Sequence, residues 1–141
     1  MANISREKWK VLLKSTKFFE IFYDHEIDKI LPFCGLLRFP MHKYIIKENE
    51  TGLSFYVVVK GHANVINRSQ SSGNRKLLTI HTGECFGEMA VITHTPRNND
   101  IISGSDCHVS KINAATIDSF EKSMQLKLHK QFSENLINRL L

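Results

Sequence analysis

The first third of the chain has the hydrophobic spacing of short helices. Between residues 4 and 17 apolar side chains recur every three or four positions, which predicts an amphipathic helix. An aromatic cluster at 18–22 is expected to pack against the main body. Asp24 is the expected N-cap of a second, short helix that reaches Leu31, and Pro32 ends it.

The middle of the chain changes to short strand-like runs. From Leu36 to about Ile112, runs rich in Val, Ile, Phe and Tyr alternate with Gly, Asn and Ser at intervals of roughly 8–12 residues. Such spacing is typical of an antiparallel sandwich or jelly-roll. The polar segment 67–76 is expected to be an exposed hairpin loop. The predicted strands are 36–39, 44–47, 53–59, 63–67, 76–81, 100–103 and 108–112.

The end of the chain returns to helical spacing. Asn113 is a plausible N-cap for a helix to about Lys122, and a second helix follows to the end. The leucine-rich stripe of this second helix (Leu128, Phe132, Leu136 and Leu140) would pack on its own domain or pair with a second copy. We therefore expect a mainly β fold, an antiparallel β-roll or jelly-roll barrel with N-terminal and C-terminal helices. One domain would comprise a helical segment 1–34, a roll 35–112 and C-terminal helices 113–141.

Composition narrows the class of protein. The 141 residues are 42% hydrophobic, enough for one folded core, and no apolar run approaches the ~20 residues of a membrane helix. Three cysteines without Cys-x-x-Cys spacing and the absence of a signal-peptide core favour reduced thiols and a cytoplasmic location. The net charge of +5 is concentrated near the start, where a basic helix would contact acidic lipid or nucleic acid or would simply be solvated.

The segment 85–97 carries the residue types that a small sugar phosphate requires. Gly87 allows backbone to approach an anion, and the amides at the start of the following helical turn would point toward it. Glu88 can accept a hydrogen bond from a ribose hydroxyl. Arg97, nine residues later, can bind phosphate oxygens with its planar guanidinium.

This segment closely resembles the phosphate-binding cassette of the cyclic-nucleotide-binding domain family. Upstream, the segment 48–61 with Gly52, Phe55, Tyr56 and Gly61 is similar to a second glycine-anchored segment of the family, and Asp106-Cys107 resembles its last strand. The resemblance implies a non-enzymatic sensor that binds cAMP or cGMP without a cofactor or metal and relays binding through its C-terminal helix. It also implies an effector domain or partner protein outside this chain, without direct nucleic-acid contact.

The resemblance also assigns roles within the cassette, residues 86–99. Glu88 would hold the ribose 2′-hydroxyl, backbone at Gly87, Met89 and Ala90 would line the phosphate, and Arg97 would neutralise it. Gly52 would shape the turn that faces the ribose, and the C-terminal helices would close over the base. The expected ligand-binding residues are Phe86, Gly87, Glu88, Met89, Ala90, Pro96, Arg97, Asn98 and Asn99.

Other interpretations of these residues exist. Glu88 and Arg97 would form a plain ion pair, and Phe86, Met89 and Val91 would be core. After Arg97 the family has Ala or Thr, then Ala, then Thr, and a threonine directly after the arginine often accompanies cGMP preference. This chain has Asn98-Asn99-Asp100 instead, in which the two amides would crowd the pocket or add hydrogen bonds. Asp100 would oppose phosphate if it faced the ligand and would be harmless if it pointed outward.

Three further functions remain as alternatives. A degenerate module of the same fold would act in protein–protein interaction without nucleotide. A cupin-type metal enzyme would need clustered ligands, but the seven histidines lack metal-binding spacing. A DNA-binding regulator would append a helix-turn-helix after the last helix, for which residues up to Leu141 leave no room. We expect a stand-alone sensor or a fragment of a larger protein.

Overall fold

The computed structural model describes residues 5–69 and 73–140. The helical elements are α1 (Arg6–Lys14), α2 (Asp24–Ile30), η1 (Leu31–Phe33), α3 (Glu88–Thr93), η2 (Ala114–Ser119) and α4 (Lys122–Leu140). The strands are β1 (Cys34–Phe39), β2 (Tyr44–Ile46), β3 (Ser54–Lys60), β4 (Ala63–Ser69), β5 (Gly73–Ile80), β6 (Cys85–Phe86), β7 (Asp100–Ser103) and β8 (Cys107–Asn113). Residue 4 of the predicted first helix, residues 70–72 of the predicted loop and residue 141 lie outside the described residues.

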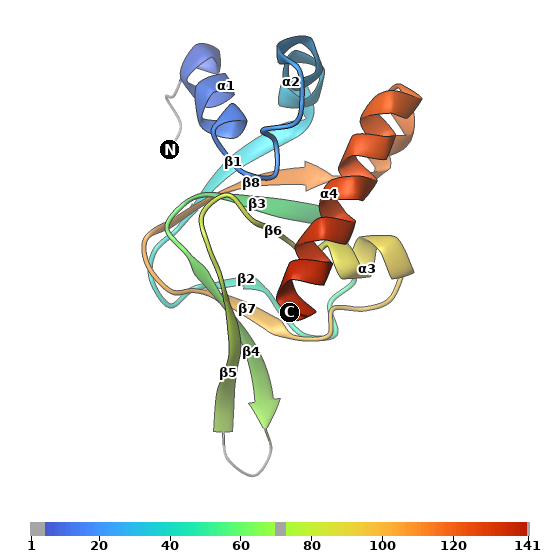
Figure 1. Cartoon of the computed structure of the whole chain (residues 1–141). Coiled ribbons are helices and arrows are strands. Elements are labelled where there is room, and N and C mark those ends of the chain that lie inside the picture. The colour runs from blue at the N-terminus through green and yellow to red at the C-terminus, as the bar shows by residue number, and fades with distance from the viewer. Residues whose placement is uncertain (1–4, 70–72, 141) are drawn as a thin grey trace.

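Within the described residues the strands form two four-stranded antiparallel sheets (Figure 1). One sheet has the order β1-β8-β3-β6 and the other β2-β7-β4-β5. The chain crosses repeatedly from one sheet to the other, which is the winding of a β-roll. The predicted antiparallel roll with flanking helices is confirmed. The closed barrel is not formed, because between the described strands no ladder joins one sheet to the other.

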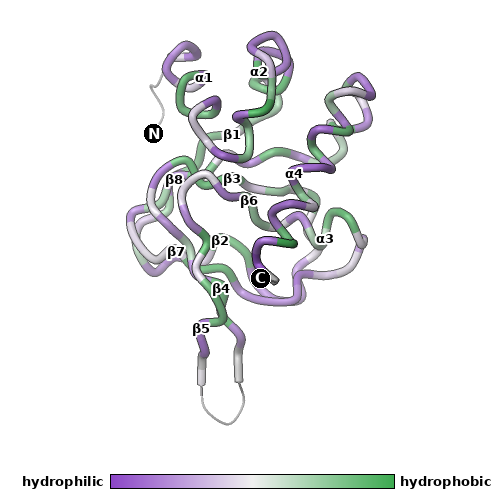
Figure 2. Tube along the Cα trace, in the orientation of Figure 1, coloured by the Kyte–Doolittle hydropathy of each residue, from purple (hydrophilic) through white to green (hydrophobic). Residues whose placement is uncertain are grey.

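Strand β3 separates two hydrophobic cores. Phe55, Val57 and Val59 face the helices, whereas Tyr56 and Val58 face the interior of the roll. Successive side chains of a strand point to opposite faces, and a run of β-branched residues suits a strand that is buried on both. The apolar residues accordingly concentrate where β3 runs between the helices and the second sheet (Figure 2).

The helices cover one side of the roll, with α1 and α2 above it and α4 running down toward α3 (Figure 1). Helix α4 inserts Met124, Leu128 and Phe132 into the helix-facing core, where each is at most 1% exposed. Gln131 Nε2 donates to the carbonyl of Phe18 at 2.9 Å. The predicted stripe of the last helix therefore packs on its own domain through its first two members.

Polar contacts also join the N-terminal helices to one another and to α4. Lys10 Nζ lies 3.0 Å from an Asp28 carboxylate oxygen, and the Lys127 ammonium lies 2.5 Å from Glu26 Oε1. Part of the basic N-terminal face is thus neutralised within the domain. Among residues 5–69 and 73–140, no helix has the length and apolarity to cross a membrane.

Some element boundaries differ from the prediction. The cap of α2 is Tyr23, whose backbone amide is held by Glu26 Oε1 at 2.8 Å, so Asp24 is already the first helical residue. Asn113 is a cap as predicted, since its side chain accepts from the amide of Ala115, but the element that follows is a short 3-10 helix. Strand β6, only two residues long, was too short to give a period-two signal.

Candidate functional site

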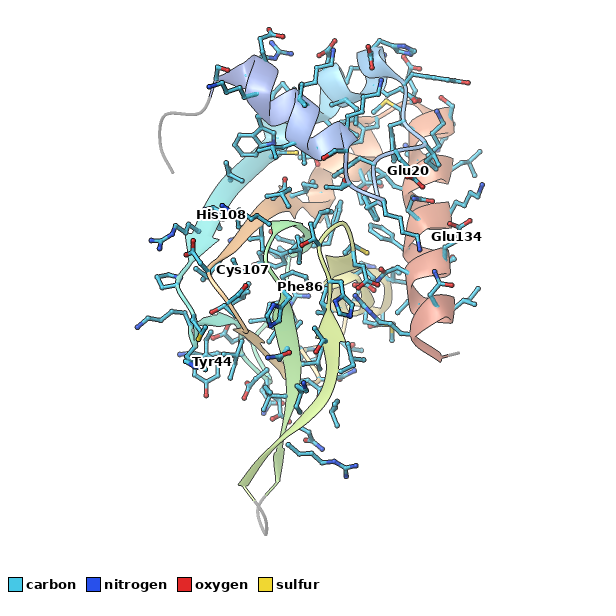
Figure 3. The ribbon with its side chains drawn as sticks, turned by 60° about the vertical axis from the view of Figure 1, so that its left-hand side comes forward. Glu20, Tyr44, Phe86, Cys107, His108 and Glu134 are labelled. Atoms are coloured by element: carbon cyan, nitrogen blue, oxygen red, sulfur yellow. The ribbon has the colours of Figure 1, made fainter. Side chains whose placement is uncertain are left out.

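A cavity of about 220 Å3 lies between the cassette, the second sheet and the end of α4. Its walls include all of the residues that the sequence predicts as ligand-binding, namely Phe86, Gly87, Glu88, Met89, Ala90, Pro96, Arg97, Asn98 and Asn99. The remaining walls are the apolar side chains of Ile46, Val65, Leu78, Ile80, Ile101 and Leu136, together with Arg139. Phe86, labelled in Figure 3, is 1% exposed and stacks on Tyr56 at 4.9 Å between ring centroids.

The cassette begins where β6 turns into α3. Gly87 is the N-cap of α3 with φ of 82°, a left-handed conformation that glycine adopts without steric cost. Added side-chain atoms at this position would also lie 3.1 Å from the guanidinium of Arg97. The first amides of a helix have no intrahelical acceptor, so the start of α3 leaves donors available next to Gly87.

Arg97 is held in place by backbone. Its Nη1 donates to the carbonyl of Gly87 at 2.5 Å and its Nη2 to the carbonyl of Ser54 at 2.6 Å. The guanidinium lies directly over Gly52, where a Cβ atom would be 2.0 Å from Arg97 Cζ. Gly52 is thus required for the close approach of Arg97, a different role from the predicted shaping of a turn near ribose.

Burial of the Arg97 guanidinium affects its pKa. Arg97 is 7% exposed, and desolvation lowers its pKa, while the nearby Tyr56, Glu88 and Glu50 oppose that shift. A guanidinium remains protonated at neutral pH in proteins, so the pocket has a buried positive charge. With two of its five N–H donors directed at carbonyls, Arg97 retains donors for an anion.

Glu88 has a different partner from the one in the ion-pair interpretation. Its Oε1 accepts from Asn135 Nδ2 at 2.9 Å and from Arg139 Nη1 at 3.0 Å. The same two side chains donate to the carbonyl of Cys85, from Asn135 at 2.9 Å and from Arg139 Nη2. We call this group, Cys85 and Glu88 with Asn135 and Arg139, the clasp.

The other cassette positions divide between core and pocket. Met89 is 45% exposed, so the interpretation of Met89 as core is wrong, whereas Phe86 is core and pocket wall together. Asn98 is exposed and Asn99 half-buried at the pocket wall. Asp100 does not point outward: it is fully buried, and its Oδ1 accepts from the amide of Glu48 at 2.8 Å.

The turn before β3 is tied to the cassette through its backbone. Asn49 has φ of 70°, a left-handed geometry that asparagine tolerates better than most residues. Its amide donates to the carbonyl of Arg97 at 2.8 Å, and the amide of Arg97 donates to the carbonyl of Glu50 at 2.9 Å. Arg97 is therefore positioned by main chain on both sides.

A larger cavity of about 680 Å3 is lined by parts of α3 and η2, but neither Glu88 nor Arg97 lines it. Its walls are mostly apolar, with His94, Asp118 and His129 as the ionisable side chains. Within the described ranges, no three His, Cys, Asp or Glu side chains gather as a metal site would require.

Two residues of the site were missed by sequence reasoning. Asn135 and Arg139 follow Phe132 by three and seven positions, which puts them on the buried face of α4. That spacing was the available signal, but it gives no indication of which part of the roll the helix covers. Figure 3 shows the opposite side of α4, where Glu134 points away from the roll.

Comparison with known proteins finds a family that this chain matches. The model of the cyclic nucleotide-binding domain matches residues 36–123. A cGMP-dependent protein kinase of Plasmodium berghei is 28% identical over 102 residues, 72% of this chain and 11% of the kinase. The chain therefore spans only about a tenth of the length of this curated relative.

Solved structures agree on the fold. The regulatory domain of Toxoplasma gondii PKA with cAMP has a TM-score of 0.76 and 25% identity, covering 92% of this chain and 50% of that one. The regulatory subunit of a cAMP-independent protein kinase A from Trypanosoma brucei has a TM-score of 0.71 and 19% identity, covering 77% and 40%. With a family model that matches more than half of its length and a roll of the same architecture, the chain belongs to the cyclic nucleotide-binding domain family.

Proposed function

We propose that this domain is a sensor that binds cAMP or cGMP in the 220 Å3 cavity and relays binding through α4. The observation that carries the proposal is that the nine residues predicted from the cassette all line this one cavity. The proposal includes no catalytic step: the domain binds and releases its ligand unchanged, and any reaction belongs to an effector or partner protein outside this chain.

The chemistry of the cavity suits a cyclic nucleotide. One part of the wall is apolar, from Ile46, Leu78 and Ile101, and offers a surface for a purine base. The polar part has two cations, Arg97 and Arg139, against one carboxylate, Glu88. This excess of positive charge matches the single negative charge of a cyclic phosphate.

Within this proposal Arg97 is the principal phosphate ligand. A guanidinium held by two carbonyls is already oriented, so little side-chain entropy is lost when an anion binds. Gly87 and the first amides of α3 would contribute backbone contacts on the adjacent side. Asn98 and Asn99 would add amide hydrogen bonds to phosphate or base.

A nucleotide-free interaction module is the second candidate. The observation that favours it is the clasp, because the carboxylate that would hold ribose already has two donors from α4. The Trypanosoma brucei relative is described as cAMP-independent, so the fold itself does not require a response to cAMP.

Calorimetric titration of the purified domain decides between the two. We expect saturable heat with cAMP or cGMP and none with 5′-AMP at the same concentrations, because the open phosphate carries a second charge. The ratio of the two dissociation constants would identify the preferred messenger. A folded sample that gives no heat and no thermal stabilisation with either cyclic nucleotide at millimolar concentration would contradict the sensor proposal and favour the interaction module.

A further inference from the structure

A further cavity, of about 250 Å3, lies where the two sheets approach each other without a joining ladder. One side of it is lined by Ile45 and Ile46 of β2, and the other by Tyr56 of β3 and Lys111 of β8, which belong to the opposite sheet. We call it the seam cavity. Two of its walls, Ile46 and Arg97, are also walls of the 220 Å3 cavity. The guanidinium that was assigned to cyclic phosphate is therefore shared by two cavities.

The guanidinium of Arg97 presents a different edge to each cavity. Gly87 is a wall of the 220 Å3 cavity, and a Cβ atom added there would lie 3.1 Å from Nη1. Gly52 is a wall of the seam cavity, and a Cβ atom added there would overlap Nε and Nη2. The Nη1 edge thus borders the proposed nucleotide site, and the Nε–Nη2 edge borders the seam cavity.

Donors remain on both edges. Nη1 donates to the carbonyl of Gly87 and Nη2 to the carbonyl of Ser54, which uses one of the two hydrogens on each nitrogen. Arg97 is only 7% exposed, and a charge-assisted hydrogen bond in a sheltered place is stronger than one at the open surface. The edge that borders the seam cavity is therefore able to bind an anion of its own.

The charges around the seam cavity favour a ligand with one negative charge. Lys111 adds a second cation, and its Nζ lies 6.0 Å from the centre of the Tyr56 ring. Burial raises the pKa of the Tyr56 phenol, Arg97 opposes that shift and Glu50 adds to it, so both charges act on the same space. Two cations against the one carboxylate of Glu50 leave a net positive charge, which a single anionic group would balance.

The apolar walls and the size of the cavity define the rest of the ligand. Ile45 lies on one side, and Leu53, which is 69% exposed, lies at the rim. The volume is below the range of about 300–1,000 Å3 that is typical of pockets for drug-sized molecules. We infer that the seam cavity binds a small organic monocarboxylate, with its carboxylate on Arg97 and Lys111 and its hydrocarbon part on Ile45 and Leu53.

Such a ligand would act on nucleotide binding, a consequence that rests on the proposed function. One guanidinium would hold two anions at the same time, and their like charges would repel each other across a short, poorly solvated distance. The carboxylate would therefore weaken binding of the cyclic nucleotide. By linkage, the nucleotide would weaken binding of the carboxylate by the same factor.

Direct binding is tested with sodium butyrate as the probe and with butyramide, which has the same shape without the charge, as its control. Nuclear magnetic resonance follows the backbone amides of Gly52 and Ser54. Lys111→Met removes the seam cation, and Lys60→Met, at an exposed position of β3, is the matched control. We expect saturable shifts with butyrate but not butyramide, and about fivefold weaker butyrate binding in Lys111→Met alone.

The effect on the nucleotide is measured by calorimetry, with butyrate replacing chloride at constant ionic strength. We expect the dissociation constant of the preferred cyclic nucleotide to rise about fivefold and then level off as butyrate saturates the seam cavity. In chloride alone, Lys111→Met should bind the nucleotide as wild type does, because Lys111 is not a wall of the 220 Å3 cavity. A rise that continues without a plateau, or that is unchanged in Lys111→Met, would show that butyrate enters the nucleotide site and would overturn the inference.

The two proposals fail in different ways. A folded protein that binds butyrate but neither cyclic nucleotide would support the seam site and contradict the sensor function. Nucleotide binding without saturable butyrate shifts at Gly52 and Ser54 would overturn the seam site and leave the sensor function in place.

Discussion

The two polar ends of the cavity are held by different parts of the chain. At the end proposed to bind phosphate, Arg97 is fixed by the carbonyls of Gly87 and Ser54, so backbone of the roll and cassette alone orients it. At the end proposed to bind ribose, Glu88 Oε1 accepts from Asn135 and Arg139 of α4, about fifty residues further along the chain. The first end is therefore oriented by backbone, and the second is linked to α4.

Under the proposed function, this difference would let one pocket both bind a ligand and transmit binding to α4. A ligand group that meets a pre-oriented cation gains affinity without changing the protein. A ligand group that meets a carboxylate already bound by α4 changes the contacts of that helix, and such a change gives the differential affinity that any switch requires. Under the proposed function, phosphate would supply binding free energy and ribose would act on the contact between the cassette and α4.

The largest expected effect is at the phosphate end. Arg97→Ala removes the buried guanidinium and should weaken binding of the cyclic nucleotide by about 2–3 kcal/mol, since a charge-assisted contact in a sheltered site is lost. Calorimetric titration measures this change. Arg75→Ala, at an exposed position on β5, is the control and should leave affinity unchanged.

Arg97→Lys separates charge from geometry. A lysine ammonium cannot donate to both carbonyls in the planar pattern of the guanidinium, so most of the loss should remain. If Arg97→Ala binds as tightly as wild type while its thermal unfolding shows an intact fold, the assignment of the cassette is wrong.

A smaller effect is expected from Gly52→Ala, which leaves Arg97 present but displaces it. The new methyl group would lie 2.0 Å from Arg97 Cζ, so the guanidinium must move and lose a carbonyl partner. We expect about tenfold weaker binding, consistent with the loss of one hydrogen bond to a charged group. Gly35→Ala is a matched control, because its nearest neighbour would be 3.9 Å away. Equal affinities of the two variants would show that the position of Arg97 does not matter.

The third prediction concerns how α4 is anchored away from the pocket. Lys127→Met removes the partner of the buried Glu26 while keeping the apolar stem, and we expect about 1–2 kcal/mol of lost stability at neutral pH, measured by urea unfolding. Lys130→Met, at an exposed site one turn later, should change stability little. An unchanged midpoint in Lys127→Met would show that α4 is held by apolar packing alone.

The same pair gives a pH dependence with a definite sign. Burial raises the pKa of Glu26, but hydrogen bonds from Lys127 and the Tyr23 amide outweigh it and leave the pKa below its ordinary value of 4.5. A depressed pKa contributes stability above the unfolded value that is lost as pH falls through the folded value. The stability difference between wild type and Lys127→Met should therefore be largest at neutral pH and shrink in acid.

The gathering of the cassette residues at one cavity could be predicted from sequence, because they lie close together in the chain. Gly87, Glu88 and Arg97 fall within one segment, and the turn before β3, which contains Gly52, supplies the rest. Apolar runs between turn residues likewise identified the long strands, including β3, which is buried on both faces. The two-residue β6 and the 3-10 helix η2 were missed or misassigned because such short elements have almost no periodicity.

The partners of Glu88 could not be predicted from sequence, because they are remote in the chain. The helical spacing after Phe132 puts Asn135 and Arg139 on the buried face of α4, but only the docking of the helix brings them to Glu88. Burial of Asp100 was missed for the same reason: strand alternation leaves two faces, and the contact with the Glu48 amide decides between them.

The smallest expected effect concerns the choice between nucleotides. Asn98 is exposed at the pocket wall, at the position after the arginine where the family resemblance associates threonine with cGMP preference. Asn98→Thr should move the ratio of the cAMP and cGMP dissociation constants toward cGMP by about fivefold, which is the contribution of one neutral hydrogen bond. Asn67→Thr, exposed on β4, is the control and should leave the ratio unchanged. Residue 98 takes no part in the guanidinium contacts or in the clasp. The affinity for either nucleotide alone should therefore change less than the ratio of the cAMP and cGMP dissociation constants. An unaltered ratio would mean that the side chain at 98 does not face the base, and that selectivity depends on the α4 end of the pocket instead.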